Sequence, residues 1–501
     1  MTQKTPNIVM LICDGMRVDW LGALGQTPCQ TPTWDKMVRE GALLEQHRTT
    51  GPMCSPARAS ILTGLQPHQA GMATISYTYT QQEKDDKAHK WPGLSRPAFA
   101  QSLREVGYET FHVGKWHVGE NNIWQWYDWA ACWRTGDPDY TAWCKLQGVP
   151  DGFVFHDPVR GAPYRSKQEP GMSLYQTGML DIPEDKEHNW WVLSHAIELL
   201  HYRPGNKPFF FTLSFEGPHP PLVVPREYYD MYDPADVKQP ENWESNDREP
   251  GFLSDSYYRK IRSEWSDDFD DWRKAIAVSW GYTTYVDRLF GIFLNNLEQL
   301  GVLENTVVVM LSDHGDMFGQ HMLSQIFCPY DEVLRVPCVI RAPGQIAPGR
   351  CVMDTSHVDI APTILALAGT GSDGHMEGEN LLPYLNGSRT APDQRDTFCQ
   401  YNMSPYFRQF HGVLEWRSLL RRPWKYVLHQ NGSAELFNIE EDPGERNNRA
   451  SLAQTQPLES ELRRTLLAWC KRTSDRFVEG FPSAVSPTDT LAPADTSPQS
   501  S

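Results

Sequence analysis

The sequence predicts an α/β protein with a large, mostly parallel sheet sandwiched by helices, followed by a smaller α+β subdomain. Short β-branched or aromatic runs alternate with longer helical patterns, and the strongest runs are apolar almost throughout. After about Pro383 the strands become shorter and more polar. We therefore expect a large domain over 1–383 and a C-terminal subdomain over 384–480. Residues 481–501, rich in Ser, Pro, Thr and Ala, are expected to be disordered.

Four strands are predicted for the large sheet, because four short runs are apolar enough to be covered on both faces. These runs are residues 8–13, 209–215, 306–311 and 336–341. No stretch reaches the ~18 uninterrupted apolar residues typical of a membrane-spanning helix. We therefore expect no membrane partner.

Helices are predicted where apolar residues recur every three or four positions. One such stripe runs over 282–300, and Gly301 is expected to end its helix. A second helix is predicted over 359–367. In the C-terminal subdomain we expect strands over 416–420 and 425–429 and a final helix over 458–471.

The composition excludes several classes of protein. The chain has 501 residues and a formal net charge of −17, which argues against nucleic-acid binding. The N-terminal apolar run lacks the cleavage site of a signal peptide. Ten cysteines are scattered without a CxxC pair, in a chain large enough not to need disulfides. These features predict a cytoplasmic protein with mostly reduced thiols.

Polar residues directly follow two of the predicted strands. Asp14 comes after the first strand, and Asp313 with His314 after the third. In open parallel sheets ligands bind outside the carboxyl ends of the strands, and carboxylates with an imidazole suit a divalent cation. The alternative is that each is a turn or cap residue.

The segment 51–64 (GPMCSPARASILTG) is the sharpest local motif. Pro56 suits the first turn of a helix, so Cys54 lies at the helix N-terminus, where the dipole and Arg58 stabilise an anion or a thiolate. The alternative is a buried structural cysteine. A thiolate phosphatase is disfavoured, because only three residues separate Cys54 from Arg58.

This motif resembles the C-x-P-x-R signature of the type I sulfatases, which belong to the alkaline phosphatase superfamily and have an alkaline phosphatase-like fold. Further motifs resemble the family in the same order along the chain. They are Gly114–His117 (GKWH), Ser214–His219 (SFEGPH), Ser312–Asp316 (SDHGD), Val358–Thr363 (VDIAPT) and Glu435–Asn438 (ELFN). The resemblance implies that the 1–383 domain is a catalytic sulfatase domain and that Cys54 is oxidised to formylglycine.

The resemblance also implies a metal-assisted mechanism. A divalent metal ion would be bound by Asp14, Asp313, His314 and an oxygen of the hydrated aldehyde at position 54. A hydrate oxygen would attack sulfur, and the sulfated intermediate would collapse to aldehyde and sulfate. His117 would be the base for that collapse.

Three further residues take roles from the same resemblance. Lys115 and Arg58 would hold the hydrate and offset negative charge, and His219 would contact the sulfate or protonate the leaving oxygen. Without the family pattern, Lys115 reads equally well as a surface lysine and His219 as a turn residue.

Two departures point to one branch of the family. Gly15 stands where many sulfatases have a second Asp, and His314 stands where many have Asn. Both changes resemble choline sulfatases and phosphonate monoester hydrolases. Replacing a carboxylate by an imidazole shifts the preferred metal from Ca²⁺ toward Mn²⁺, and both ions stay open.

A third departure concerns the substrate. Ile326 stands where the family usually has a lysine that contacts the transferred group. Gln325 is adjacent, and Arg408, His411 or Lys425 are candidates to complete the site. Trp116 begins a tryptophan-rich segment whose rings are suited to stack on a sugar or cage a quaternary ammonium group, or else form a packing layer.

We therefore expect a sulfuric ester hydrolase that acts on a small sulfate monoester. The alternatives are a phosphonate monoester hydrolase or phosphodiesterase with the same nucleophile and, less favoured, a non-catalytic anion-binding relative. The expected partners are the substrate and a formylglycine-generating maturation enzyme, and the sequence leaves room for a homo-oligomer.

Overall fold

The computed structural model of the protein describes ten stretches of the chain. They are residues 5–75, 94–119, 123–132, 138–149, 177–180, 182–243, 269–323, 326–371, 374–403 and 414–480. The predicted tail 481–501 lies outside them.

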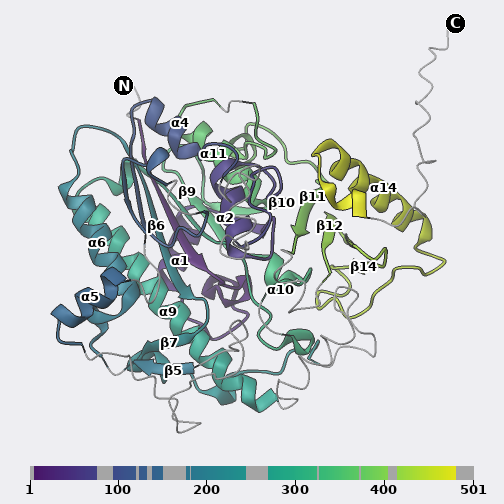
Figure 1. Ribbon diagram of the computed structural model, residues 1–501, viewed down its shortest axis with the longest axis horizontal. Coiled ribbons are helices and arrows are strands. Elements are labelled where there is room, and N and C mark those ends of the chain that lie inside the picture. The colour runs from purple at the N-terminus through teal and green to yellow at the C-terminus, as the bar shows by residue number, and fades with distance from the viewer. Residues whose placement is uncertain are drawn as a thin grey trace, which may run out of the picture.

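An eight-stranded sheet forms the centre of the larger part of the molecule (Figure 1). Its strands lie in the order β10 (Gly349–Ser356), β2 (Ala42–Arg48), β9 (Cys338–Arg341), β8 (Thr306–Ser312), β1 (Asn7–Asp14), β6 (Phe209–Pro218), β3 (Glu109–Gly114) and β4 (Trp129–Ala131). Neighbouring strands run parallel except at β9, which is antiparallel to both β2 and β8. The expectation of a large, mostly parallel sheet is confirmed.

The four predicted strands are present in this sheet with small differences at their ends. β1 is buried at all eight positions and pairs with β6 and β8, so Met10 lies between Thr212 and Val309. β9 begins at Cys338, two residues later than expected. Pro337 has no N–H to donate to a ladder, which explains the later start.

Helices cover both faces of the sheet, and each face has its own apolar core. Alternate residues of β1 point to opposite faces and so belong to different cores. Val9 and Leu11 pack in one core, and Met10 packs in the other. The first core includes residues of α1 (Pro32–Glu40), α6 (His188–Tyr202) and α9 (Phe269–Gln299). The second includes residues of α2 (Cys54–Thr63), α4 (Phe99–Glu105) and α11 (Ile360–Leu367).

The predicted helices are longer or shorter than their patterns suggested. α9 contains most of the predicted stripe but begins at Phe269, well before the stripe starts. α11 begins at Ile360, because the 3-10 helix η9 (His357–Asp359) takes the first residue assigned to it. The further elements are α5 (Pro138–Leu146), α7 (Arg226–Tyr229), α10 (Asp331–Leu334), α12 (Leu382–Leu385), β5 (Thr177–Leu180) and β7 (Leu222–Pro225).

A second, antiparallel sheet lies at one end of the molecule, on the right in Figure 1. It consists of β11 (Thr397–Tyr401), β12 (Trp416–Arg421), β13 (Trp424–His429) and β14 (Ala434–Asn438). Helix α14 (Gln456–Arg472) packs on it through Leu462, Leu466 and Trp469. All of these elements fall within residues 384–480, and the smaller α+β unit is confirmed. The exact boundaries of the domains stay a prediction.

Two further observations concern the cysteines and the helices of the chain. All ten cysteines are free thiols. Among the described residues, the helices include none that combines the length and the apolar character needed to cross a membrane.

Candidate active site

Two strand ends and one helix start meet at a single place. Asp14 is the last residue of β1, Asp313 follows β8 directly, and Cys54 is the first residue of α2. The carboxyl ends of parallel strands meet at one edge of a sheet, which explains why residues so distant in sequence come together. All three side chains are buried, with Cys54 2% exposed.

Asp14, Cys54, Asp313 and His314 form a cluster with the geometry of a metal site. One possible ligand atom from each residue lies within 4.8 Å of the others. His314 Nε2 is 3.1 Å from Cys54 Sγ, 3.6 Å from Asp14 Oδ1 and 3.9 Å from Asp313 Oδ1. This is the set of ligands expected from the sequence.

The orientation of each ligand suits a cation at the centre of this cluster. Arg58 binds the outer oxygens, with Nε 2.8 Å from Asp313 Oδ2 and Nη2 3.1 Å from Asp14 Oδ2. The Oδ1 atoms are therefore the ones near His314. The imidazole can donate from Nδ1 to the Gly315 carbonyl at 2.9 Å, which leaves the lone pair of Nε2 for a metal.

The electrostatics of the cluster favour the same conclusion. Although burial opposes protonation, the Asp313 carboxylate and its neighbours raise the pKa of His314 to about 10. Burial, together with Asp14, raises the pKa of Asp313 to about 6. Two buried carboxylates this close attract positive charge, and a divalent cation fits the donor set.

Lys115 supplies a positive charge close to both Asp14 and Cys54. Its Nζ lies 2.6 Å from Asp14 Oδ2 and 3.8 Å from Cys54 Sγ. Burial and Asp14 raise the pKa of the Cys54 thiol, but Lys115, His314 and a hydrogen bond with His117 lower it well below its usual value. Position 54 is therefore a site that stabilises an anion.

A glycine allows Lys115 to reach this position. Gly114 ends β3 with φ +97°, and a Cβ there would lie 1.9 Å from the Ser214 carbonyl oxygen. The same carbonyl accepts the Lys115 N–H at 2.9 Å. Only glycine permits this close approach of β3 to β6.

Two histidines complete the surroundings of Cys54. His117 is buried and adopts φ +55°, a left-handed conformation that costs energy for a non-glycine residue and is common at functional sites. His219 is half-buried, and its Nδ1 can donate to the Pro220 carbonyl at 2.5 Å. Its ring also hydrogen-bonds Cys54, and although burial lowers its pKa, Asp14 raises it overall.

The expected substrate-binding residues are placed less completely. Gln325, Arg408 and His411 lie outside the described residues. Ile326 is buried in an apolar cluster that includes Met53, the residue before Cys54. The expected lysine position is therefore apolar in this chain.

Lys425 does not supply the missing charge. It is 1% exposed and pairs with Asp331 at 3.1 Å and with Glu445. These two carboxylates account for its positive charge, which corrects its candidacy for the substrate site.

Of the two roles expected for Trp116, the structure favours packing. The ring is 7% exposed and packs in the core against Trp126 and Tyr127. The other described tryptophans of this segment do not gather around Cys54. Trp143 lies on α5, at the edge of the molecule away from α2, and stacks on Tyr140 (Figure 1). A packing layer, the alternative expectation, describes Trp116, Trp126 and Trp143 better.

Two further residues form hydrogen bonds to residues of the site and were not predicted from the sequence. Ser214 Oγ accepts a hydrogen bond from Arg58 Nη1 at 2.8 Å. His357 Nε2 lies 2.8 Å from the backbone carbonyl of Asp313. Ser214 belongs to a motif that was recognised, but its side chain carries no charge to draw attention. His357 is distant in sequence from every other site residue, so spacing gave no indication.

Comparisons with known families identify the family of the chain. A family model described as Sulfatase matches residues 6–370. A second, described as N-sulphoglucosamine sulphohydrolase, C-terminal, matches residues 319–472.

Individual relatives extend the similarity over nearly the whole chain. An arylsulfatase from Clostridium perfringens is 27% identical, over 95% of this chain and 96% of the relative. A choline-sulfatase from Rhizobium meliloti is 25% identical, over 90% of this chain and 83% of the relative. The solved structure of a phosphonate monoester hydrolase from Silicibacter pomeroyi superposes with a TM-score of 0.77 at 20% identity, over 94% and 96% of the two chains.

Proposed function

Because the chain belongs to the sulfatase family, we propose that it hydrolyses a sulfate monoester at Cys54 after this cysteine has been converted to formylglycine. One observation carries the proposal. Cys54 Sγ belongs to a cluster with the donors of a metal site and lies 3.8 Å from the buried ammonium group of Lys115. An oxygen nucleophile in its place would be held and polarised by both the metal and this cation.

The metal site of the proposal consists of Asp14, Asp313, His314 and the side chain at position 54. A divalent ion, Ca²⁺ or Mn²⁺, would supply Lewis-acid polarisation of the nucleophile and of a substrate oxygen. Formylglycine, as its hydrate, would supply one oxygen to attack sulfur and a second hydroxyl through which sulfate is released.

Four residues of the chain supply charge stabilisation and proton transfer. Lys115 and Arg58 offset negative charge on the reacting group, since both are buried and hydrogen-bonded toward the site. His117 accepts the proton from the side chain at position 54, to which it is hydrogen-bonded. His219 has its Nδ1 at the Pro220 carbonyl and is hydrogen-bonded to position 54, so its other nitrogen would donate to the departing alcohol oxygen.

A phosphonate monoester hydrolase or phosphodiesterase with the same nucleophile is the second candidate. It is favoured by the fold shared with the phosphonate monoester hydrolase and by Gly15 and His314 in the metal motifs. Purified protein assayed on an aryl sulfate, a phosphodiester and a phosphonate monoester separates the two. We expect the highest kcat/KM on the sulfate, and a clear preference for either phosphorus ester would reverse the assignment.

The modification of Cys54 is tested by peptide mass spectrometry on protein from its native host. We expect the peptide that spans Cys54 to show the mass deficit of formylglycine, produced by a maturation enzyme. An entirely unmodified thiol would contradict the proposed nucleophile and favour a non-catalytic relative.

The substitution Cys54→Ala tests the same residue by activity. Turnover should fall by at least about a thousandfold, because the nucleophile is removed. Cys470→Ala, at a buried cysteine of α14, is the matched control and should keep its activity. Retained sulfatase activity in Cys54→Ala would refute the mechanism.

A further inference from the structure

A series of buried, hydrogen-bonded side chains connects β10 to the backbone carbonyl of Asp313, one of the proposed metal ligands. Thr355 Oγ1 lies 3.0 Å from His47 Nδ1, and His47 Nε2 lies 3.0 Å from His357 Nδ1. His357 Nε2 lies 2.8 Å from the carbonyl oxygen of Asp313. Thr355, His47 and His357 are each 0% exposed, so water does not compete for these hydrogen bonds.

The Asp313 carbonyl at one end of this series fixes the donor and the acceptor of every hydrogen bond in it. A carbonyl can only accept, so His357 Nε2 carries the proton and His357 Nδ1 is an acceptor. His47 must therefore donate from Nε2 and accept the Thr355 hydroxyl at Nδ1. Burial, which lowers the pKa of His357 to about 4 and that of His47 well below its usual value, keeps both rings neutral as this arrangement requires.

The carbonyl that His357 binds belongs to the peptide between two proposed metal ligands. On its other side, the His314 N–H of the same peptide donates to Asp313 Oδ1 at 3.0 Å. The Gly15 N–H donates to that oxygen at 3.2 Å. The peptide that joins Asp313 to His314 is thus held at its carbonyl and at its N–H.

His357 is itself held rigidly. It begins the 3-10 helix η9, whose last residue, Asp359, accepts the backbone N–H of Ser356 and of Glu379, each at 2.8 Å. Arg395 binds the two oxygens of Asp359 at 2.6 and 2.7 Å. His47 and Thr355 are direct neighbours across the parallel pair β2 and β10.

We propose that His357, oriented by His47, is a positioning residue that holds the Asp313–His314 peptide so that both side chains face the metal. Nothing in this role requires His357 to touch metal or substrate. The inference rests on the metal site of the proposed function. Partners of metal ligands typically change affinity by about 10- to 100-fold when they are removed.

Calorimetric titration of the metal-stripped full chain with Mn²⁺ tests this role without any assay of turnover. His357→Leu removes the donor and should weaken Mn²⁺ binding by about 10- to 100-fold. His357→Gln, whose amide reaches the place of Nε2, should restore most of the affinity. His357→Asn keeps an amide that is too short to reach the carbonyl, and should bind as weakly as His357→Leu.

The comparison of Gln with Asn keeps the test decisive even if His357→Leu fails to fold. Equal affinities in these two variants would overturn the inference. Thr363→Val is the matched control. Thr363 lies on the adjacent helix α11, and its buried hydroxyl accepts a hydrogen bond from the Leu381 N–H, which the substitution removes. It should lose stability and keep its Mn²⁺ affinity, and an equal loss of affinity there would show a general effect of destabilisation.

Titration of the wild-type chain distinguishes a failure of the proposed metal site from a failure of the positioning role of His357. If the wild-type chain binds no Mn²⁺, the proposed metal site itself is contradicted for this ion. If it binds Mn²⁺ and the His357 variants bind equally well, only the positioning role fails.

Discussion

Arg58 shows how a single residue organises the site. It lies four positions after Cys54, one turn along α2, so both side chains lie on the same face of the helix. Its guanidinium binds Asp14 and Asp313, and Nη1 also donates to the Lys115 carbonyl at 3.0 Å. The planar fork of arginine suits several acceptors at once, whereas a lysine would not. The spacing of the C-x-P-x-R motif therefore has a direct structural reason.

Lys115→Met tests the second cation of the site. We expect kcat on an aryl sulfate to fall by about 10²- to 10³-fold, because a preorganised positive charge beside the nucleophile is lost. Steady-state kinetics on the purified variant measures this. Lys425→Met is the control, since it removes an equally buried lysine that pairs with Asp331 instead. The control should lose stability but retain the kcat of its folded fraction, and a wild-type kcat in Lys115→Met would refute the assigned role.

At the scale of elements, the start of α6 links α9 to the end of β6. Glu187 caps α6 by accepting the Trp190 N–H at 3.0 Å, and it accepts the hydroxyl of Tyr285 on α9 at 2.8 Å. Asn189 accepts the Glu216 N–H at 3.2 Å, near His219. This buried junction positions the turn that carries the proposed acid.

The same junction predicts a pH dependence of stability. Burial raises the pKa of Glu187 from 4.5 to about 7, so the folded chain binds this proton more tightly than the unfolded chain. The stabilising contribution is therefore complete below about pH 4.5 and is lost as the pH rises through 7. The raised pKa corresponds to about 3 kcal/mol between these limits.

Urea unfolding of the wild type and of Glu187→Gln over pH 4.5 to 8 measures this contribution. Subtracting the two free energies of unfolding cancels the other titrating groups. We expect the advantage of the wild type over the variant to fall as the pH rises. A difference that stays constant with pH would exclude Glu187 as the source.

At the scale of the whole molecule, a buried ion network joins the two sheets. Asp331, at the start of α10, pairs with Arg48 at the end of β2 at 2.8 Å and with Lys425 of β13 at 3.1 Å. Figure 1 shows α10 between the large sheet and the C-terminal sheet. Tyr401 and Trp416 of the C-terminal sheet also share an apolar cluster with Met53, next to Cys54. The smaller unit thus supports the site directly.

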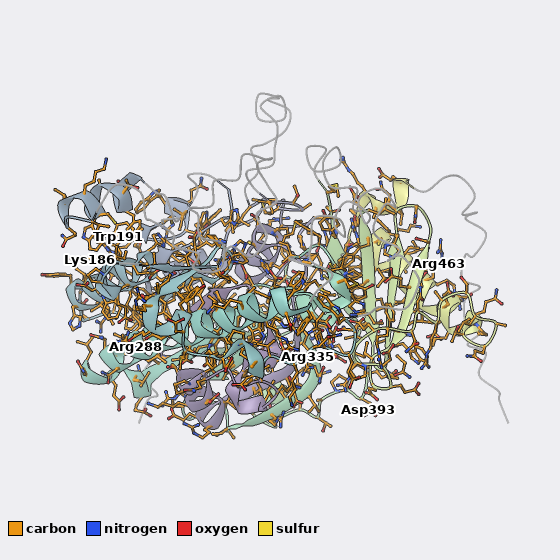
Figure 2. All side chains as sticks on the ribbon, turned by 90° about the horizontal axis from the view of Figure 1, so that it is seen from below. Lys186, Trp191, Arg288, Arg335, Asp393 and Arg463 are labelled. Atoms are coloured by element: carbon orange, nitrogen blue, oxygen red, sulfur yellow. The ribbon has the colours of Figure 1, made fainter. Side chains whose placement is uncertain are left out.

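Asp331→Asn tests this connection. The Arg48 and Lys425 charges would lose their shared carboxylate, so the free energy of unfolding should fall by about 3–5 kcal/mol. Asp393→Asn, at an exposed position of the same half of the chain, should change it by less than about 0.5 kcal/mol (Figure 2). Chemical denaturation of both variants measures the difference, and similar values would mean that the network contributes little.

The strands and helices were largely predictable from the sequence, because apolar runs and apolar periodicity reflect burial directly. The four predicted strands of the large sheet and the predicted strands and helix of the C-terminal unit are all present. The antiparallel direction of β9 was not predictable, since an apolar run looks the same in either direction. The additional strands β2, β3 and β10 carry charged residues that mask their patterns.

The site was predictable where a motif fixed both residue type and spacing. Asp14, Cys54, Asp313 and His314 were expected together and lie together. The role of Trp116 stayed open in the sequence, because an aromatic residue beside a motif looks the same whether it packs in the core or faces a ligand; in the structure its ring is buried. Ser214 and His357 were missed because their contribution depends on contacts with Arg58 and with a backbone carbonyl.

The sequence by itself therefore determined the fold class, the candidate metal ligands and the likeness to the sulfatases, since these depend on residue type, order and local spacing. Tertiary structure alone decided that Ile326 lies in an apolar cluster, that Lys425 is engaged by Asp331, and that His357 lies behind Asp313. The physical reason is that burial and hydrogen bonding between distant segments are set by packing. The position of a residue in the sequence does not by itself show which residues will surround it in the folded protein.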